Sequence, residues 1–125
     1  MTFYNVCPAE IESGGPELAH QMCHRLNDAG LEAYMYYIKS NDINPQDVNA
    51  SDKYIKYNTF HAKQLSEIEQ DTSVVVFNEG ATGLIPLIKH CHKVLWWMSV
   101  DNYLINTDGR DIDVIRKEVV LHLVQ

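Results

Sequence analysis

Two apolar segments constrain the fold of this chain more than any other feature. Residues 74–77 (VVVF) form an uninterrupted apolar run, and Trp96 and Trp97 are adjacent in a second apolar segment. Consecutive residues of a strand point to opposite faces of a sheet, so each segment needs cover on both faces. Strands that are buried on both faces are typical of parallel sheets with helices on either side.

The rest of the chain alternates between short segments of strand formers and segments with helical spacing. We expect strands at 2–6, 31–38, 73–77, 93–98 and 119–125, and helices at 16–29, 60–69, 81–92 and 111–118. Pro16 suits a first helical position and Gly30 a helix end, and Pro86 is expected in the first turn of the third helix. This order predicts an α/β fold, a doubly wound parallel sheet of about five strands, in a single domain covering residues 1–125.

Composition excludes several classes of function. The chain has 10 basic and 17 acidic residues, a net charge of −7, and no cluster of Lys or Arg. Binding to phosphates of nucleic acids needs a basic surface, so we expect no nucleic-acid partner. Cys7, Cys23 and Cys91 include no C-x-x-C pair, which favours a reducing cytoplasm over disulfides. No apolar run approaches the ~18 residues of a membrane span, and we expect no secretory signal in MTFYNVCPAE.

Ligands of an open α/β sheet bind outside the carboxyl ends of its strands. Three loops are therefore expected to open on one edge, at residues 7–15, 78–83 and 99–103. Glu79 is a candidate substrate-binding residue, and Asp101 is the candidate catalytic residue, with Asn102 beside it as a further candidate for substrate binding. Helix capping and turn chemistry are the structural alternative for both carboxylates.

Gly14 and Gly15 precede Pro16, where the first helix is expected to begin. One interpretation is a tight turn with Gly15 as the N-cap. The other is a ligand site, because glycine lets an anion approach the N–H groups and the positive end of a helix. The dipole contributes about 0.3–1 kcal/mol when exposed and up to ~2 kcal/mol when partly buried, so this loop alone would hold a phosphate weakly. Glu17, in the same turn, would repel an anion unless its side chain turns away.

Familiar nucleotide and metal motifs are missing from the sequence. It contains neither G-x-x-x-x-G-K-[ST] nor G-x-G-x-x-G, so we expect no P-loop, no ordinary dinucleotide site and no cofactor. His20 and His24 are four residues apart, but they fall off the apolar stripe of the first helix and are expected in solvent. His90 and His92 end a different helix, and no carboxylate completes a ligand set, so no metal site is expected.

Residues 39–58 are polar and lack a clear period. A segment of this length is long for a connection in a compact domain, which predicts a mobile or functional loop. Its Tyr54 and Tyr57 are candidates for stacking on an acceptor sugar, and packing of both rings on the sheet edge is the structural alternative.

With these residues in place, the chain resembles the N-terminal domain of a GT-B glycosyltransferase. It is most similar to the family-four type of capsular and cell-surface polysaccharide biosynthesis. The matching stretches are GGPELAHQMCHRLNDAGLEAYMYY, VVVFNEGATGLIPLI and KVLWWMSVDNY, which span most of residues 1–105. Such enzymes have two Rossmann-like domains facing across a cleft. The N-terminal domain mainly receives the acceptor, and the C-terminal domain mainly holds the nucleotide-sugar.

The resemblance implies transfer of a sugar from a nucleotide-sugar donor to a glycan or lipid-linked acceptor, in the cytoplasm or at the inner face of the membrane. It also implies that Gly14 and Gly15 approach the donor phosphates from across the cleft. In the family a donor domain follows, whereas this sequence stops at Gln125 on an expected strand. We therefore expect the isolated chain to be inactive and to dimerise through its exposed sheet edge. The alternative from another class is a stand-alone α/β binding or assembly module without catalysis.

Overall fold

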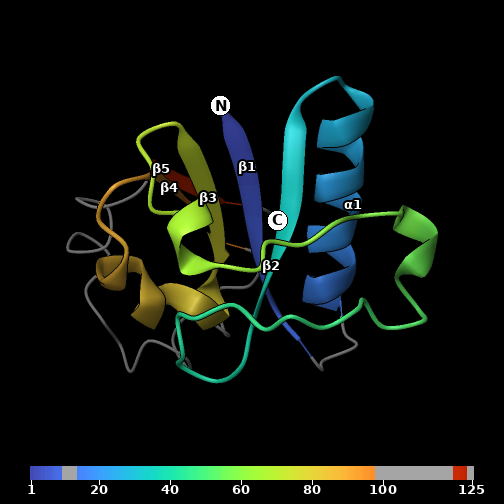
Figure 1. The fold of residues 1–125 in the computed structure, drawn as a ribbon, viewed down its shortest axis with the longest axis horizontal. Coiled ribbons are helices and arrows are strands. Elements are labelled where there is room, and N and C mark those ends of the chain that lie inside the picture. The colour runs from blue at the N-terminus through green and yellow to red at the C-terminus, as the bar shows by residue number, and fades with distance from the viewer. Residues whose placement is uncertain (10–13, 98–119, 124–125) are drawn as a thin grey trace.

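A parallel sheet forms the centre of the molecule. The structure, a computed structural model, describes residues 1–9, 14–97 and 120–123. Four strands lie within the first two ranges, and a four-residue fifth strand pairs with the last of them. The strands are β1 (Thr2–Pro8), β2 (Glu32–Ile38), β3 (Ser73–Asn78), β4 (His92–Trp97) and β5 (Val120–Leu123). They pair in the order β2-β1-β3-β4-β5, all in parallel, which is compatible with a Rossmann-like fold (Figure 1).

The alternation of side chains along the strands divides the core into two clusters. One cluster gathers under the helix α1 (Gly14–Asp28), where Ala19 and Cys23 pack against Cys7, Met35 and Tyr37 of β1 and β2. The larger cluster lies on the opposite face and includes Val6, Tyr36, Val75, Phe77, Leu84 and Ile88. Val74, Val75 and Phe77 are buried and Val76 is half-buried, so the apolar run at 74–77 has cover on both faces, as its sequence predicts.

The helix α1 ends as the sequence predicts. Gly30 has a φ of +86°, the left-handed conformation that glycine adopts without a Cβ penalty. The N–H of Leu31 donates to the carbonyl of Leu26, and the N–H of Gly30 donates to that of Asn27. This pair of hydrogen bonds is a Schellman motif, and it satisfies carbonyls that the last turn leaves without a helical partner.

The expected strands at 2–6, 31–38, 73–77 and 93–98 are confirmed, with ends that differ by one or two residues, and the described residues of the strand expected at 119–125 form β5. The expected helix at 60–69 is wrong. In its place the carbonyl of Phe60 and the N–H of Ala62 bond to the backbone of Met35, so this segment runs extended along the edge of β2. A 3-10 turn at Leu65–Glu67 then brings Leu65 and Ile68 to the core without forming an α-helix.

The expected helix at 81–92 is also wrong. The structure has a 3-10 helix, η3, at Glu79–Leu87, with Pro86 near its end instead of in the first turn. Gly80 and Gly83 lower the helix propensity of this segment, and Pro86 supplies no N–H for a continuing α-helix. The expected helix at 111–118 lies outside the described residues.

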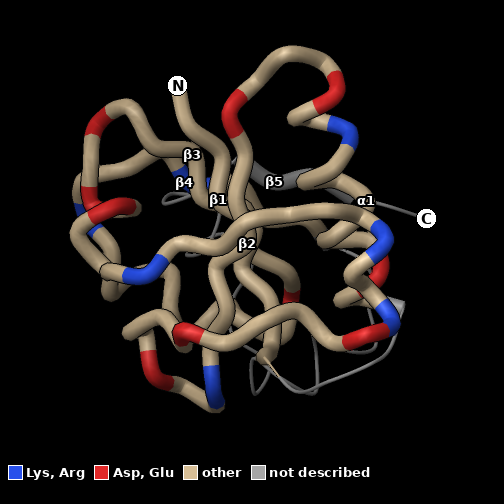
Figure 2. Tube along the Cα trace, turned by 45° about the vertical axis from the view of Figure 1, so that its right-hand side comes forward, with Lys and Arg blue, Asp and Glu red and all other residues tan. Residues whose placement is uncertain are grey.

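Charged side chains are dispersed over the surface. Lys and Arg are interspersed with Asp and Glu over the described chain, and no basic stripe forms on the tube (Figure 2). Within the described residues, no helix is long and apolar enough to cross a membrane.

The free edge of β2 is covered along most of its length. The Asn27 side chain bonds both backbone groups of Ala33, accepting from its N–H at 2.9 Å and donating to its carbonyl at 3.1 Å. The 60–62 segment bonds both backbone groups of Met35, and the N–H of Gln46 donates to the carbonyl of Tyr37. Unpaired edge groups recruit other chains, so these contacts protect β2 from pairing with a second molecule.

Replacing Asn27 tests this protection. In Asn27→Ala both hydrogen bonds to Ala33 are lost, and we expect the free energy of unfolding to fall by about 1–2 kcal/mol. We also expect more self-association, because a stretch of strand edge is opened. Urea unfolding and sedimentation velocity measure the two effects, with the exposed Asn41→Ala as the matched control. An Asn27→Ala protein as stable and as monomeric as the control would contradict this role.

Candidate functional site

The order in which the chain adds strands to the sheet reverses between β1 and β3. The chain passes from β1 to β2 on one side and then returns to place β3 on the other side of β1. At such a switch point the connections diverge and leave a crevice outside the carboxyl ends of the two strands, where open α/β sheets bind their ligands. Gly14 and Gly15 begin α1 after β1, and Glu79 begins η3 after β3, so both lie at this edge.

Glu79 and its neighbour Asn78 form a capped turn at the end of β3. The Asn78 side chain accepts a 2.9 Å hydrogen bond from the N–H of Gly80, and the hydroxyl of Thr82 donates to the Glu79 carbonyl at 3.5 Å. Glu79 is only 5% exposed. Asp101, the candidate catalytic residue, and Asn102, a candidate for substrate binding, lie outside the described residues.

The carboxylate of Glu17 turns away from the start of α1. The Tyr57 hydroxyl donates to its Oε1 at 2.5 Å, and the Lys56 Nζ lies 3.7 Å from the same oxygen. The hydrogen bond from Tyr57 lowers the pKa of Glu17, so the carboxylate stays ionised and engaged at neutral pH. The acidic side chain of the first turn of α1, Glu17, is therefore engaged by residues of a distant segment.

His20 is buried, and the expectation that it lies in solvent is wrong. It is 1% exposed, and its two ring nitrogens lie 2.7 Å from the Pro16 carbonyl and 2.8 Å from the Tyr37 hydroxyl. The carbonyl only accepts, so Nδ1 carries the proton, and the Nε2 of the neutral ring accepts from Tyr37. Burial lowers the pKa of His20, which favours this neutral form. The helical spacing did not predict the burial of His20, because the residues that cover its side chain come from a distant segment of the chain.

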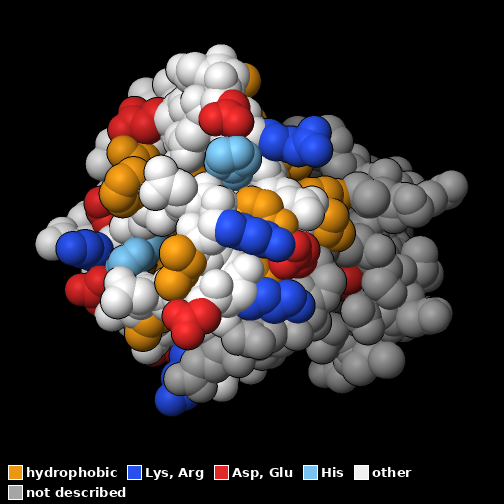
Figure 3. All heavy atoms as spheres, turned by 90° about the vertical axis from the view of Figure 1, so that its right-hand side faces the viewer, with side chains coloured by type: hydrophobic (Ala, Val, Ile, Leu, Met, Phe, Trp, Pro, Cys, Tyr) orange, Lys and Arg blue, Asp and Glu red, His pale blue; other side chains and the backbone are white. Residues whose placement is uncertain are grey.

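That cover is residues 39–58, which we call the strap. It leaves β2 and runs out to α1, and residues 60–62, which follow it, return along the edge of β2 (Figure 1). The ring of Tyr54 stacks on His20 with centroids 4.4 Å apart, and the Tyr57 carbonyl lies 3.0 Å from the Nδ1 of His24. Figure 3 shows this face, on which basic and acidic side chains lie next to one another.

The burial of the strap rings bears on their expected role in sugar stacking. Tyr54 is 2% exposed, so its ring has no free face for a sugar. Tyr57 is half-buried, with its hydroxyl held by Glu17 and Gln21. Both rings pack on α1 rather than on the sheet edge, which differs from either alternative drawn from the sequence.

Cysteine and metal chemistry find no support in the described residues. Cys7 and Cys23 are buried, and burial raises the pKa of each thiol to about 12, so both stay protonated at neutral pH. The part of the chain that the structure describes contains no group of three or more His, Cys, Asp or Glu side chains placed to hold a metal ion.

Asn5 is a further candidate that the sequence patterns do not single out. This residue lies in the middle of β1, is 1% exposed, and neither its Oδ1 nor its Nδ2 has a hydrogen-bond partner. A buried amide without partners costs roughly 1–3 kcal/mol, so such residues are rare and mark sites of strain or of binding. The sequence signal is a single amide inside a segment of strand formers, TFYNV.

Comparisons with known proteins leave the family open: no family model, no curated protein and no solved structure matches this chain.

Protonation of His20 should destabilise the fold. The folded pKa is below the ordinary value of about 6.5, so the unfolded state binds more protons as pH falls through that value. The contribution of neutral His20 is therefore present above pH ~6.5 and is lost progressively below it. We expect urea unfolding to show a smaller pH dependence between about pH 7 and pH 5 in His20→Phe than in the wild type. The exposed His90→Phe is the control, and equal slopes in the wild type and His20→Phe would overturn the assignment.

Removing the unpaired amide should stabilise the protein. Asn5→Leu keeps the number and branching of heavy atoms and removes both orphan polar atoms. We expect the free energy of unfolding to rise by about 1–3 kcal/mol, measured by urea unfolding. A decrease would mean that Asn5 is hydrogen-bonded in the free protein.

Proposed function

We propose that this chain is the N-terminal, acceptor-side domain of a GT-B glycosyltransferase of the family-four type, with a Rossmann-like doubly wound sheet. The enzyme transfers a sugar from a nucleotide-sugar to a glycan or lipid-linked acceptor in surface polysaccharide biosynthesis, in the cytoplasm or at the inner face of the membrane. The observation that carries this proposal is the start of α1 at Gly14 and Gly15, at the carboxyl end of β1 beside the switch point, with the Glu17 carboxylate turned aside.

A pyrophosphate group is the ligand that best suits this arrangement. Two glycines allow close approach to backbone N–H groups, and the helix dipole favours negative charge. Tyr57 and Lys56 engage Glu17, which reduces the repulsion that its carboxylate would exert on an anion. The α1 face of the crevice therefore admits a phosphate that a neighbouring domain also contacts.

The strength of this interaction fits an assisting role. A helix start supplies about 0.3–1 kcal/mol, which corresponds to roughly two- to fivefold in affinity, and up to ~2 kcal/mol, roughly thirtyfold, when partly buried. Nucleotide-sugar enzymes need more than this to hold donor and acceptor in reactive geometry. In the proposed enzyme the nucleotide is held mainly by a second domain. Asp101 is the candidate catalytic residue, and Glu79 and Asn102 are the candidate substrate contacts.

Titration with nucleotide-sugars tests the proposal. We expect the chain alone to transfer no sugar and to bind UDP-glucose, UDP-N-acetylglucosamine or GDP-mannose in the millimolar range. In ¹⁵N–¹H spectra the amides of Gly14, Gly15 and Gly80 should shift, and those of Ser73 and His92 at the opposite edge should not. Gly15→Asp should weaken binding severalfold through charge repulsion, whereas Ala29→Asp, at the far end of α1, should leave it unchanged.

Two results would contradict the proposal. Micromolar binding would place a complete donor site within these 125 residues. Shifts confined to the opposite edge of the sheet would place the ligand away from the start of α1.

A further inference from the structure

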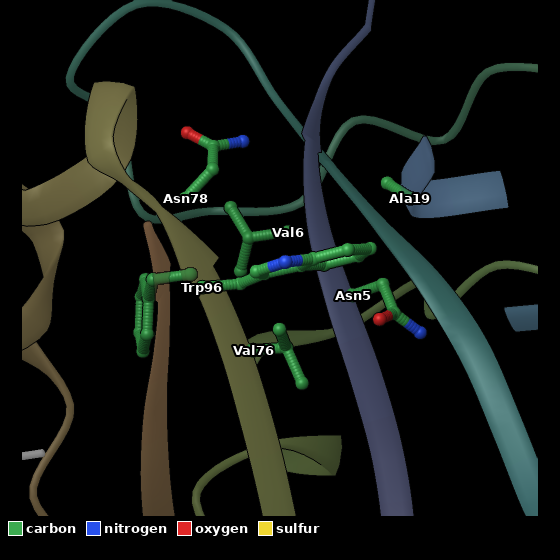
Figure 4. Close-up of a pocket in the computed structure, with 7 residues that line it drawn as sticks. Asn5, Val6, Ala19, Val76, Asn78 and Trp96 are labelled. Atoms are coloured by element: carbon green, nitrogen blue, oxygen red, sulfur yellow. The ribbon is translucent and has the colours of Figure 1, made fainter. Parts of the chain in front are cut away.

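A small hollow lies on the α1 face of the sheet at the switch point. It is lined by Asn5 of β1, Val76 and Asn78 of β3, Trp96 of β4 and Ala19 of α1, among others. The strand register brings these residues together, because Asn5 pairs with Val76 and Asn78 pairs with Trp96. Figure 4 shows the Trp96 indole extending across the sheet toward Asn5, with Ala19 on the far side.

Asn5 supplies the strongest sign of a ligand in this hollow. Its carboxamide is 1% exposed, and both of its polar atoms lack a hydrogen-bond partner. One of these atoms donates and the other accepts, so a single partner that satisfies both must accept from Nδ2 and donate to Oδ1. A hydroxyl group is the smallest organic group that donates and accepts at once.

The size of the hollow agrees with a hydroxyl. Its volume is about 10 Å³, which is close to the space that one water-sized group occupies. A larger polar group, such as a phosphate or a carboxylate, does not fit at Asn5. The described residues that line the hollow include no charged side chain, so none of them would neutralise an ion.

The rim of the hollow adds a flat ring and a second amide. Trp96 and Asn78 are both half-buried, so each presents part of its side chain at the opening. The Oδ1 of Asn78 accepts from the Gly80 N–H, which leaves its Nδ2 to donate outward. An indole face packs well against the C–H face of a sugar ring, and amides bond sugar hydroxyls.

We propose that this hollow is a monosaccharide subsite, in which a neutral sugar inserts one hydroxyl against Asn5 and lays its ring against Trp96, with Asn78 bonding a second hydroxyl. The inference rests on the proposed function and names sugar contacts that the sequence analysis did not. Asn78 directly precedes Glu79, so the subsite lies beside the edge where Gly14 and Gly15 start α1. Sugar and phosphate would then occupy adjoining parts of one crevice.

The full 125-residue chain and neutral monosaccharides test the subsite. Glucose, galactose, mannose and N-acetylglucosamine are titrated at millimolar concentrations, and side-chain ¹⁵N–¹H signals are followed. We expect at least one sugar to shift both the Asn5 carboxamide and the Trp96 indole N–H. This readout is taken on the wild-type protein, so it does not depend on the folding of any variant.

Variants then separate the contacts. Asn5→Leu should weaken binding of that sugar about tenfold, because the inserted hydroxyl loses its partner. Trp96→Leu should weaken it as well, through loss of the ring face. Gln70→Leu makes the same change from amide to alkyl at the opposite edge of the sheet and should bind like the wild type.

The outcomes distinguish the subsite from the proposed function. Sugar binding that leaves the Asn5 and Trp96 side-chain signals unmoved would overturn the subsite, as would wild-type affinity in Asn5→Leu. A water molecule that keeps its contact to Asn5 at saturating sugar would overturn it too. None of these results would contradict the proposed function. That proposal is tested by the shifts of the Gly14 and Gly15 amide signals with nucleotide-sugars.

Discussion

The parallel pairing of β1 with β3 is the constraint on which the rest of the structure depends. It places β2 and β3 on opposite sides of β1, and ligands of open α/β sheets bind outside the carboxyl ends of strands at such a switch point. The same register sets Asn5 beside Val76, two residues before Asn78, on the face that α1 covers in part. The helix start at Gly14 and the hollow at Asn5 therefore belong to one region of the molecule.

A polar network holds the strap onto α1 beside this region. His20 is fixed by the Pro16 carbonyl and the Tyr37 hydroxyl, and it offers its ring face to Tyr54. Tyr57 then engages Glu17 in the first turn of α1. A buried imidazole is tolerated because both of its nitrogens are bonded. The strap thus engages Glu17, the acidic side chain in the first turn of α1, beside the place proposed for phosphate.

The strands and α1 could be predicted from the sequence, because apolar runs, β-branched residues and Gly30 act locally. The connections between the strands could not be predicted in this way. Residues 60–62 follow the edge of β2, and η3 replaces a helix, since backbone pairing with Met35 and the placement of Pro86 override local spacing. Of the candidate site, the edge with Gly15 and Glu79 was predictable from strand order, whereas the burial of His20 depends on a strap more than thirty residues away. Asn5 was overlooked because its lack of partners exists only in three dimensions.

The most direct test of the account is a crystal structure of this chain soaked with the nucleotide-sugar that gives the largest spectral shifts. The account predicts the pyrophosphate at the backbone N–H groups that start α1 and the sugar ring against Trp96, with one hydroxyl within hydrogen-bonding distance of Asn5. A ligand bound at the amino ends of the strands, near Thr2 and Ser73, would contradict it.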